Sequence, residues 1–337
     1  MVSMETNKRA RGLVVLLISS VLLLLSFVFS ISVGAANIDF TTVWKTIFQF
    51  GSPSDEVRSI IMEVRLPRQI AAILVGAALA VGGAIMQGIT RNPLAEPGLL
   101  GLNAGAGFAL ALIFTFIPAV GYLGKMGAAF VGAAFGAILV YRLGSVRVNA
   151  SPVRLILTGA IVHFFLLALA EGTAILFRIS QDISFWYIGR ITGVNWVQIE
   201  YIAPVVLLGI FIALIYSRHL TILSLNEEVA KGLGQDTTVT KIILMGVVLM
   251  LAGVSVAVAG MITFVGLVIP HMVRYLVGVD YRWVIPCSAF LGSLFMIIAD
   301  TIGRIISAPY ETPVGAIISL IGVPYFIFLA RRGSKTT

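Results

Sequence analysis

The sequence predicts an all-α polytopic membrane protein with about ten transmembrane helices, and two observations carry this prediction. Apolar residues make up 59% of the 337 residues and charged residues only 11%, whereas a soluble domain carries about a quarter charged residues. Long stretches such as 69–90 and 242–273 contain no Asp, Glu, Lys or Arg, and roughly 20 apolar residues suffice for one helical crossing of a bilayer. Because lipid cannot hydrogen-bond the backbone, helices are favoured, and the alternating ten-residue strands of a β-barrel are missing from the pattern.

Charges and turn residues divide the chain into ten predicted spans within a single transmembrane domain, residues 1–337. The spans are predicted at 12–34, 66–89, 94–116, 121–142, 153–177, 199–217, 240–260, 263–277, 283–303 and 313–331. The first apolar run follows Lys8, Arg9 and Arg11, as in a signal peptide. Its length of about 20 residues favours a retained first span instead.

The distribution of basic residues predicts the orientation of these spans. An even number of spans places both termini on one side, and fifteen of the 23 Lys and Arg residues then share that side. Cytoplasmic loops carry an excess of Lys and Arg. We therefore predict a multi-pass protein with cytoplasmic N- and C-termini. Arg65, Arg68 and Arg304 are among the eight basic residues on the outer side and need a separate explanation.

The sequence offers no catalytic machinery. His163, His219 and His271 lie far apart, without the spacing of metal ligands, and Gly124-Lys125 lacks the context of a phosphate-binding loop. We therefore predict no metal, no cofactor and no enzymatic site, so that any ATP used in transport would bind another subunit. The basic residues flank apolar runs and form no single basic domain, which argues against a nucleic-acid partner.

Three stretches have a more specific pattern. They are Arg65-Leu-Pro-Arg68 with 76–87 and 92–98, then 264–271 with Arg274, and finally 299–304 with 311–315 and 322–326. In this order they closely resemble the FecCD family of binding-protein-dependent ABC importer permeases, which handle iron–siderophores, haem and cobalamin. The resemblance runs from about residue 12 to the C-terminus.

This resemblance implies a type II ABC importer permease fold and a set of partners. It implies pairing with a second permease, identical or different, and with two cytoplasmic ATPase subunits. An extracytoplasmic binding protein would deliver the cargo at the bacterial cytoplasmic membrane. A ferric siderophore is the expected cargo, with haem or cobalamin as alternatives. An ion-gradient-driven secondary transporter is the alternative from another class. Two acidic residues within the predicted spans are few for a pathway that carries a coupling ion.

The resemblance also gives the outer arginines a role. In related permeases, arginines at the positions of Arg65, Arg68 and Arg304 meet acidic residues on the binding protein, and opposed charges of this kind steer and orient a partner. The alternative is that these side chains anchor helix ends at the membrane interface.

The inner loop 220–238 is the predicted contact with the ATPase, because the resemblance places the coupling helices there. Asn226 can cap a short helix whose first turn carries Glu227 and Glu228. The residues assigned to coupling are Leu225, Asn226, Glu227, Glu228, Val229, Ala230, Gly232, Leu233 and Gly234. The predicted helix directs Leu225, Val229 and Leu233 to one side, and a solvated connector is the alternative.

Two ionisable residues fall inside the fifth span. His163 and Glu171 are candidates for lining the pathway, because ionisable groups within spans are costly and often functional. The alternative is that Glu171 pairs with His163 or with Arg178.

Small residues recur every fourth position in two strips, one from Gly76 to Gly88 and one from Gly124 to Gly136. Such strips let helix backbones approach closely in lipid. We expect both strips to pack within the chain, with a dimer interface or a pore wall as the alternative.

Overall fold

The computed structural model describes residues 2–34, 38–48, 54–144, 152–308 and 310–333, and within them the regular elements are all helical. The elements are α1 (Val2–Ser32), α2 (Phe40–Ile47), α3 (Asp55–Ser59), η1 (Ile60–Arg65), α4 (Leu66–Thr90), η2 (Pro97–Leu100), α5 (Leu102–Phe116), α6 (Tyr122–Gly144), α7 (Pro152–Leu176), α8 (Ser180–Tyr187), α9 (Trp196–Ile215), α10 (Ser217–Leu225), α11 (Glu227–Gly232), α12 (Thr237–Ala259), α13 (Val265–Val277), α14 (Tyr281–Ile305) and α15 (Val314–Gly333).

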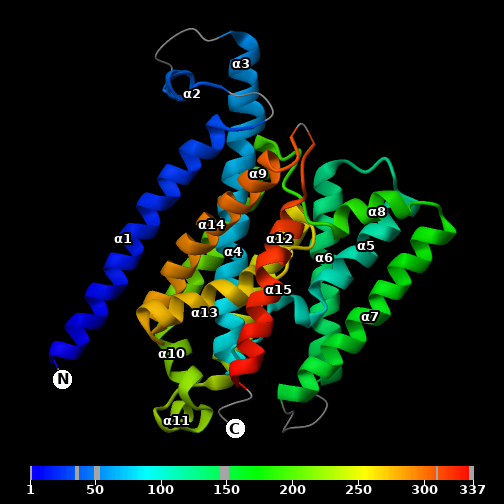
Figure 1. Ribbon diagram of the computed structural model, residues 1–337. Coiled ribbons are helices and arrows are strands. Elements are labelled where there is room, and N and C mark those ends of the chain that lie inside the picture. Colours follow the sequence, from blue (N-terminus) through cyan, green and yellow to red (C-terminus); the bar gives the residue numbers. More distant parts are fainter. Residues whose placement is uncertain (1, 35–37, 49–53, 145–151, 309, 334–337) are drawn as a thin grey trace.

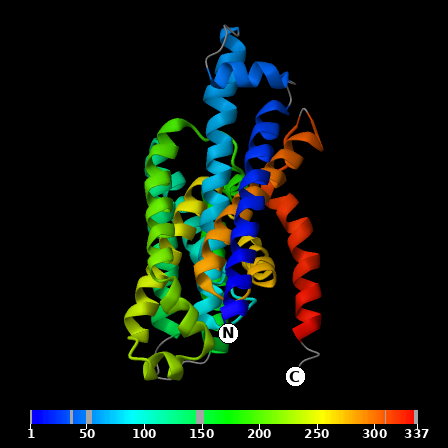
Figure 2. The same cartoon turned by 90° about the vertical axis from the view of Figure 1, so that its left-hand side faces the viewer.

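The long helices run side by side between two ends of one bundle (Figure 1). Figures 1 and 2 both show the two termini at the end that also holds α10 and α11, which we call the termini end. Helices α2 and α3 project from the other end, the α3 end. This arrangement follows from the alternation of long helices and short connections along the chain.

A helix lies within each of the ten predicted spans, with differences at the boundaries. Seven helical stretches are long and apolar enough to cross a membrane, and 102–116, 265–277 and 314–328 are shorter apolar helices. The helix predicted from residue 94 begins only at Leu102, because Pro97 opens the separate turn η2 and Gly101 takes a left-handed φ of 72°. In contrast, α9 begins three residues earlier than predicted, where Asn195 and Gln198 form a capping box.

Helix α4 is the centre of the bundle and packs against α9, α12, α13 and α14. Small residues allow this close packing. A Cβ on Gly76 would lie 2.4 Å from the carbonyl oxygen of Gly292 in α14, and a Cβ on Gly83 would lie 1.9 Å from that of Gly266 in α13. The packing interpretation of the Gly76–Gly88 strip is therefore confirmed.

The second strip packs in the same way over part of its length. Gly132 and Gly136 of α6 approach the backbone of Gly105 in α5 and of Gly101 just before α5, where added Cβ atoms would collide. Gly124 differs, because an added Cβ would meet Val120 just before its own helix. The strip therefore holds α6 against α5 through its last two glycines, Gly132 and Gly136.

The break between α12 and α13 brings irregular backbone into the bundle. Gly260 and Phe264 have left-handed φ values of 69° and 71°. Backbone groups at this break form hydrogen bonds with the end of α8 and the residues that follow it. Arg190 N donates to Ala259 O at 2.8 Å, and Met261 N donates to Trp186 O at 3.3 Å. Such pairing is what an apolar surrounding requires of non-helical backbone.

Candidate functional site: a buried arginine cluster and the exposed helix α11

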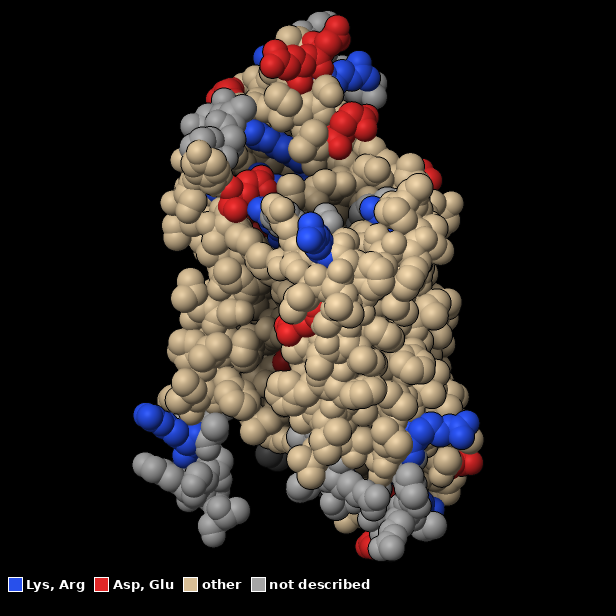
Figure 3. Space-filling model, turned by 90° about the vertical axis from the view of Figure 1, so that its right-hand side faces the viewer, with Lys and Arg blue, Asp and Glu red and all other residues tan. Residues whose placement is uncertain are grey.

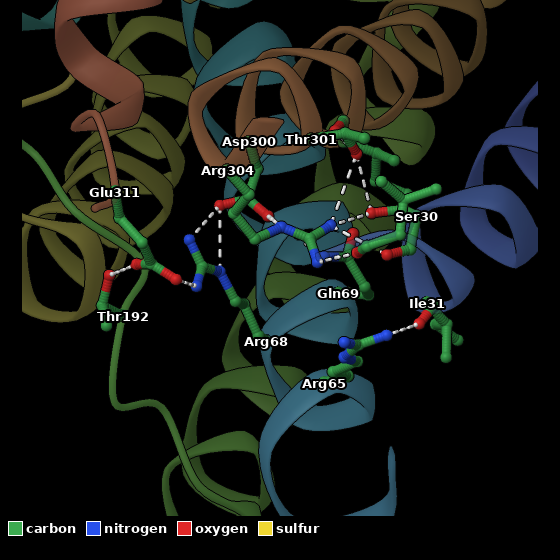
Figure 4. Close-up of polar contacts among 12 residues, drawn as sticks. Ser30, Ile31, Arg65, Arg68, Gln69, Thr192, Asp300, Thr301, Arg304 and Glu311 are labelled. Carbon is green, nitrogen blue, oxygen red and sulfur yellow. Dashed lines mark hydrogen bonds and ion pairs between the residues drawn. The ribbon is translucent and has the colours of Figure 1, made fainter. Parts of the chain in front are cut away.

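The first polar feature is a buried arginine cluster at the α3 end, formed by α1, α4, α14 and the segment before α15 (Figure 4). Arg68 donates through Nε and Nη2 to Asp300 Oδ1 at 3.0 and 2.9 Å, and through Nη1 to Glu311 Oε1 at 2.6 Å. Arg304 lies 3.2 Å from the other oxygen of Asp300. One carboxylate therefore joins two guanidinium groups.

The same cluster closes the end of α1. Arg304 donates to the carbonyls of Val33 and Ser30 at 2.8 and 2.9 Å, and Arg65 donates to that of Ile31 at 2.6 Å. The last four carbonyls of a helix have no partner within that helix. The two arginines supply such partners for Ser30 and Ile31 of α1, and so they fasten α1 to η1 and α14.

Local sequence explains how these side chains meet. Arg65 and Arg68 lie one turn apart where η1 passes into α4, and Asp300 and Arg304 lie one turn apart near the end of α14. Glu311 comes from the segment before α15, and its second oxygen accepts from the Thr192 hydroxyl at 3.0 Å. Residues one turn apart share a helix face.

Burial separates this cluster from an open docking surface. Arg65, Arg68 and Arg304 are only 6–8% exposed. A buried charge needs a partner inside the protein, and each of the three has one or more. Docking by these residues remains a prediction, and the structure shows that they also join helix ends. The ion pairs of Arg68 with Asp300 and Glu311 join residues far apart in the sequence, so no local spacing of residues indicated them.

The electrostatics of Glu311 follow from its position. Burial alone raises the pKa of this carboxyl, but the hydrogen bond and charge of Arg68 outweigh burial and leave the pKa below its usual value. The carboxylate therefore stays ionised beside Arg68 at neutral pH. This ion pair joins the segment before α15 to the start of α4.

The second polar feature is the α10–α11 segment at the termini end. Asn226 caps α11 by accepting a hydrogen bond from Glu228 N at 2.8 Å, and Gly234 follows the helix with a φ of 79°. Leu225, Val229 and Leu233 are 64%, 49% and 67% exposed. The predicted cap and the predicted apolar edge are both present.

The two glutamates of α11 have different surroundings. Glu227 lies 2.6 Å from Lys241 of α12 and 3.3 Å from Lys231, while Glu228 is exposed. The hydrogen bond from Lys241 is the main reason why the pKa of Glu227 is lower than usual. Glu227 therefore holds α11 against α12, with Ala230 buried beneath it, and Glu228 remains available to a partner.

The candidate pathway residues on α7 do not meet. Glu171 is exposed and His163 is half-buried beside the ring of Phe164. Within the part of the chain that the structure describes, no hydrogen bond or ion pair joins His163 to Glu171 or Glu171 to Arg178. The alternative of internal pairing is therefore not seen, and the pathway role stays a prediction.

Figure 3 shows the face of the molecule that includes α7. Lys, Arg, Asp and Glu gather towards its two ends, and the broad band between them is almost free of charge apart from acidic atoms near its centre. A hollow runs along this band. An uncharged band of this kind suits the hydrocarbon core of a bilayer.

Sequence reasoning also missed a partly buried link between distant segments. Glu96 Oε1 accepts a hydrogen bond of 2.6 Å from Phe264 N, at the start of α13. The carboxylate thus caps a helix from another part of the chain, where anions are favoured. The two residues are far apart in sequence, so no local motif indicates this contact.

Apolar helices with charged groups at both ends are typical of a membrane protein, and residues 22–332 match the FecCD transport family. The chain belongs to this family of ABC transporter permeases.

Similar proteins agree with this membership. The chain is 47% identical over 330 residues to the iron(3+)-hydroxamate import system permease protein of Bacillus subtilis (strain 168), covering 97% of this chain and 86% of the relative. It is 40% identical to the Fe(3+)-citrate import system permease protein of the same organism, covering 97% of each. A solved metal-chelate type ABC transporter in an inward-facing conformation matches with a TM-score of 0.81 and 29% identity, covering 94% of this chain and 98% of that chain. The all-α permease fold expected from the sequence is confirmed.

Proposed function

We propose that this chain is the permease subunit of a binding-protein-dependent ABC importer that moves a ferric siderophore across the bacterial cytoplasmic membrane. The observation that carries the proposal is the 47% identity to a ferric hydroxamate permease over 97% of the chain. The relatives described above are both named for ferric chelates. This favours a ferric siderophore over haem or cobalamin.

The proposal assigns a partner to each end of the bundle. Two ATPase subunits would bind the termini end in the cytoplasm, and a binding protein would dock on the α3 end outside. The exposed apolar edge of α11 supports the first assignment, because an exposed apolar edge on so short a helix favours contact with another protein. ATP would bind the partner subunits, and this chain would carry no site for it.

Motion of the ATPase would reach the membrane helices through α11. Glu227 and Lys241 fasten α11 to α12 at 2.6 Å, and α12 packs against α4, α6 and α9. A displacement of α11 would therefore move α12 with it. In this scheme Leu225, Val229 and Leu233 contact the ATPase, and Glu228 adds a charge to that contact.

The pathway would run between this chain and a second permease. Helix α15 packs on α13 and α14, while α7 packs on α5 and α6, and both present large apolar side chains to the outside, including Leu320 and Phe164. Pairing of two permeases across these faces would enclose the hollow seen in Figure 3. Glu171 and His163 on α7 would then lie near the cargo.

The buried arginine cluster would contribute to docking by ordering the α3 end. Arg65, Arg68 and Arg304 would hold the surface in shape and lend it positive charge, and the carboxylates Asp300 and Glu311 pair with Arg68 and Arg304. An Arg68→Lys variant separates shape from charge, because Lys keeps the charge but cannot form two parallel bonds. We expect weaker binding-protein affinity. Unchanged affinity in Arg68→Lys, together with a loss in Arg68→Gln, would assign the role to charge alone.

Transport in proteoliposomes tests the proposed function. With the ATPase, the second permease and the binding protein present, uptake of a ferric trihydroxamate should require ATP and should survive ionophores that collapse ion gradients. Uptake that needs an ion gradient and proceeds without ATPase would support the rival secondary transporter and refute this proposal.

Substitutions on α11 test the ATPase contact. A Leu225→Ser/Leu233→Ser variant should lose co-purification with the ATPase and ATP-driven uptake, while its unfolding midpoint stays near that of the wild type. Val279→Ser is the matched control, because Val279 is 60% exposed and lies between α13 and α14, off α11. Equal retention of ATPase by both variants would contradict the assignment.

A further inference from the structure

A second, half-buried cation lies far from the cluster at the α3 end. Arg274 occupies the last turn of α13, close to the termini end. Nearby, the first residue of α14 is joined to α10, because Tyr281 N donates to Thr221 Oγ1 at 2.9 Å. Its Nη2 donates to Gln87 Oε1 of α4 at 2.5 Å. Among the residues that the structure describes, no carboxylate pairs with Arg274.

Proline chemistry explains why Gln87 faces Arg274. Pro270 has no N–H, so the carbonyl of Gly266 four residues earlier lacks its helical donor. Gln87 Nε2 lies 3.4 Å from that carbonyl and 3.2 Å from the carbonyl of Leu267. These bonds orient the amide so that Oε1 points to Arg274. Gln87 is therefore a positioning residue for the guanidinium.

Two nitrogen atoms next to this contact have no partner. Arg274 Nη1 and His271 Nδ1 are both buried and make no hydrogen bond in the described part of the chain. His271 and Arg274 lie one turn apart on α13, and the ring of Tyr325 from α15 lies 6.0 Å from that of His271. Most buried polar groups in proteins are hydrogen-bonded, and exceptions call for an explanation.

These features together describe a recognition site for negative charge. A guanidinium held by a neutral amide keeps its full charge, and one of its nitrogens and a histidine nitrogen one turn away on the same helix both lack a partner among the described residues. Arginine and histidine donors suit an anionic oxygen, with bonds stronger than those to a neutral acceptor. The dipole at the C-terminus of α13 favours a cation at this position, but it does not supply a hydrogen-bond acceptor for Nη1.

We propose that Arg274, His271 and Tyr325 form a binding site for an oxyanion, a phosphate or carboxylate group, at the junction of α4, α13 and α15. The ring of Tyr325 packs edge-on against the ring of His271 and so borders the site from α15. The residues remain half-buried and not fully enclosed. A ligand here touches α15, the helix that borders the proposed pathway.

The oxyanion has two possible sources with the same chemistry. One is the phosphate of an anionic phospholipid, because Arg274 lies in the last turn of α13 at the end of an apolar helix. The other is an anionic chelate passing through the permease, and this source rests on the proposed function. The experiment separates the two.

The first arm measures lipid binding. Native mass spectrometry of the purified transporter complex with added phosphatidylglycerol should show a tightly bound lipid that is lost or bound about tenfold more weakly in Arg274→Gln, as expected for one charge-assisted contact. Phosphatidylcholine should show no such difference. Arg218→Gln is the matched control, because Arg218 is an exposed arginine in α10 at the same end.

The second arm measures chelate binding in phosphatidylcholine nanodiscs. Radioactive ferric citrate, which is anionic, should bind more weakly to Arg274→Gln than to wild type or Arg218→Gln, whereas a neutral ferric trihydroxamate should bind them equally. A difference in only the first arm assigns the site to lipid, and a difference in only the second assigns it to cargo. Tyr325→Phe removes one hydroxyl and serves as the variant if Arg274→Gln does not assemble.

The proposal is overturned if Arg274→Gln and Arg218→Gln, or Tyr325→Phe and wild type in its place, behave alike in both arms. Such a result leaves the proposed function intact, provided that the wild type still imports the trihydroxamate in proteoliposomes. The two ideas can therefore fail separately.

Discussion

At the scale of single residues, Asp300 holds more of the structure than its position in an apolar helix suggests. Its carboxylate is 2% exposed and contacts both Arg68 and Arg304, and Gln69 Nε2 donates to it at 3.1 Å. Through these contacts α4 and α14 are joined at the α3 end. The carboxylate also offsets two buried cations that lipid and apolar side chains cannot solvate.

We predict that Asp300→Asn destabilises the protein by about 3–5 kcal/mol, because removing one partner leaves buried charges uncompensated. The thermal unfolding midpoint of the detergent-purified complex measures this. Asp55→Asn, at an exposed position in α3, should change the midpoint little. Equal shifts for the two variants would show that the cluster contributes no more than a surface charge.

Glu227 makes a pH-dependent prediction. Its pKa is lower in the folded protein than the usual value, mainly through the hydrogen bond from Lys241. A depressed pKa stabilises the folded state above the unfolded pKa of about 4.3, and this contribution is lost as the pH falls through the folded pKa. The unfolding midpoint of Glu227→Gln should therefore lie below that of wild type at pH 7, and the gap should narrow as the pH falls below the unfolded pKa of about 4.3.

The neighbouring glutamate provides the control. Glu228 is exposed, so Glu228→Gln should leave the midpoint nearly unchanged at both pH values. A gap for Glu227→Gln that persists unchanged at low pH would show that its charge is not the cause.

At the scale of elements, close helix packing depends on missing side chains. Gly83 lets α4 touch the backbone of α13 at Gly266, and a methyl group there cannot be accommodated by rotating a side chain. Gly246 in α12 has open space around it. The two glycines therefore test packing separately from helix propensity.

We predict that Gly83→Ala destabilises the protein by about 1–3 kcal/mol or more, because overpacking forces the helices apart. Gly246→Ala should be neutral or stabilising by up to about 1 kcal/mol, because alanine favours the helix. Unfolding midpoints of the two variants provide the comparison. A neutral Gly83→Ala would mean that the α4–α13 contact is looser than the backbone distances indicate.

The helices themselves follow from the sequence much more closely than their connections do. The range predicted at 66–89 is observed as Leu66–Thr90 and that at 263–277 as Val265–Val277, because apolar runs bounded by charge and glycine act locally. The short helices α2, α3 and α8 were not predicted. They lie in connections whose shape depends on what they pack against.

At the scale of the whole molecule, the two ends differ in kind. The α3 end buries its principal charges in a cluster that joins helices, whereas the termini end presents the exposed apolar edge of α11. Such a molecule can receive different partners at its two ends. The proposed orientation places the termini end in the cytoplasm.

Cysteine labelling in intact cells tests this orientation. The chain's single cysteine, Cys287, is buried, so background labelling should be low. A membrane-impermeant maleimide should label Asp55→Cys in intact cells, and Lys231→Cys only after permeabilisation. The reverse pattern would place the termini outside and would contradict the assignment of both partners.

The sequence by itself determined that this chain is an all-α membrane protein, where most of its apolar helices lie, and to which family it belongs, because apolar run length and short motifs are local properties. Only the tertiary structure decided that Arg65, Arg68 and Arg304 are buried among helix ends and that Glu227 and Glu228 have separate surroundings. It also decided that Arg274 pairs with no carboxylate among the residues that the structure describes. The physical reason is that the interactions and the role of a charged side chain depend on the residues around it. Here those neighbours come from helices far apart along the chain.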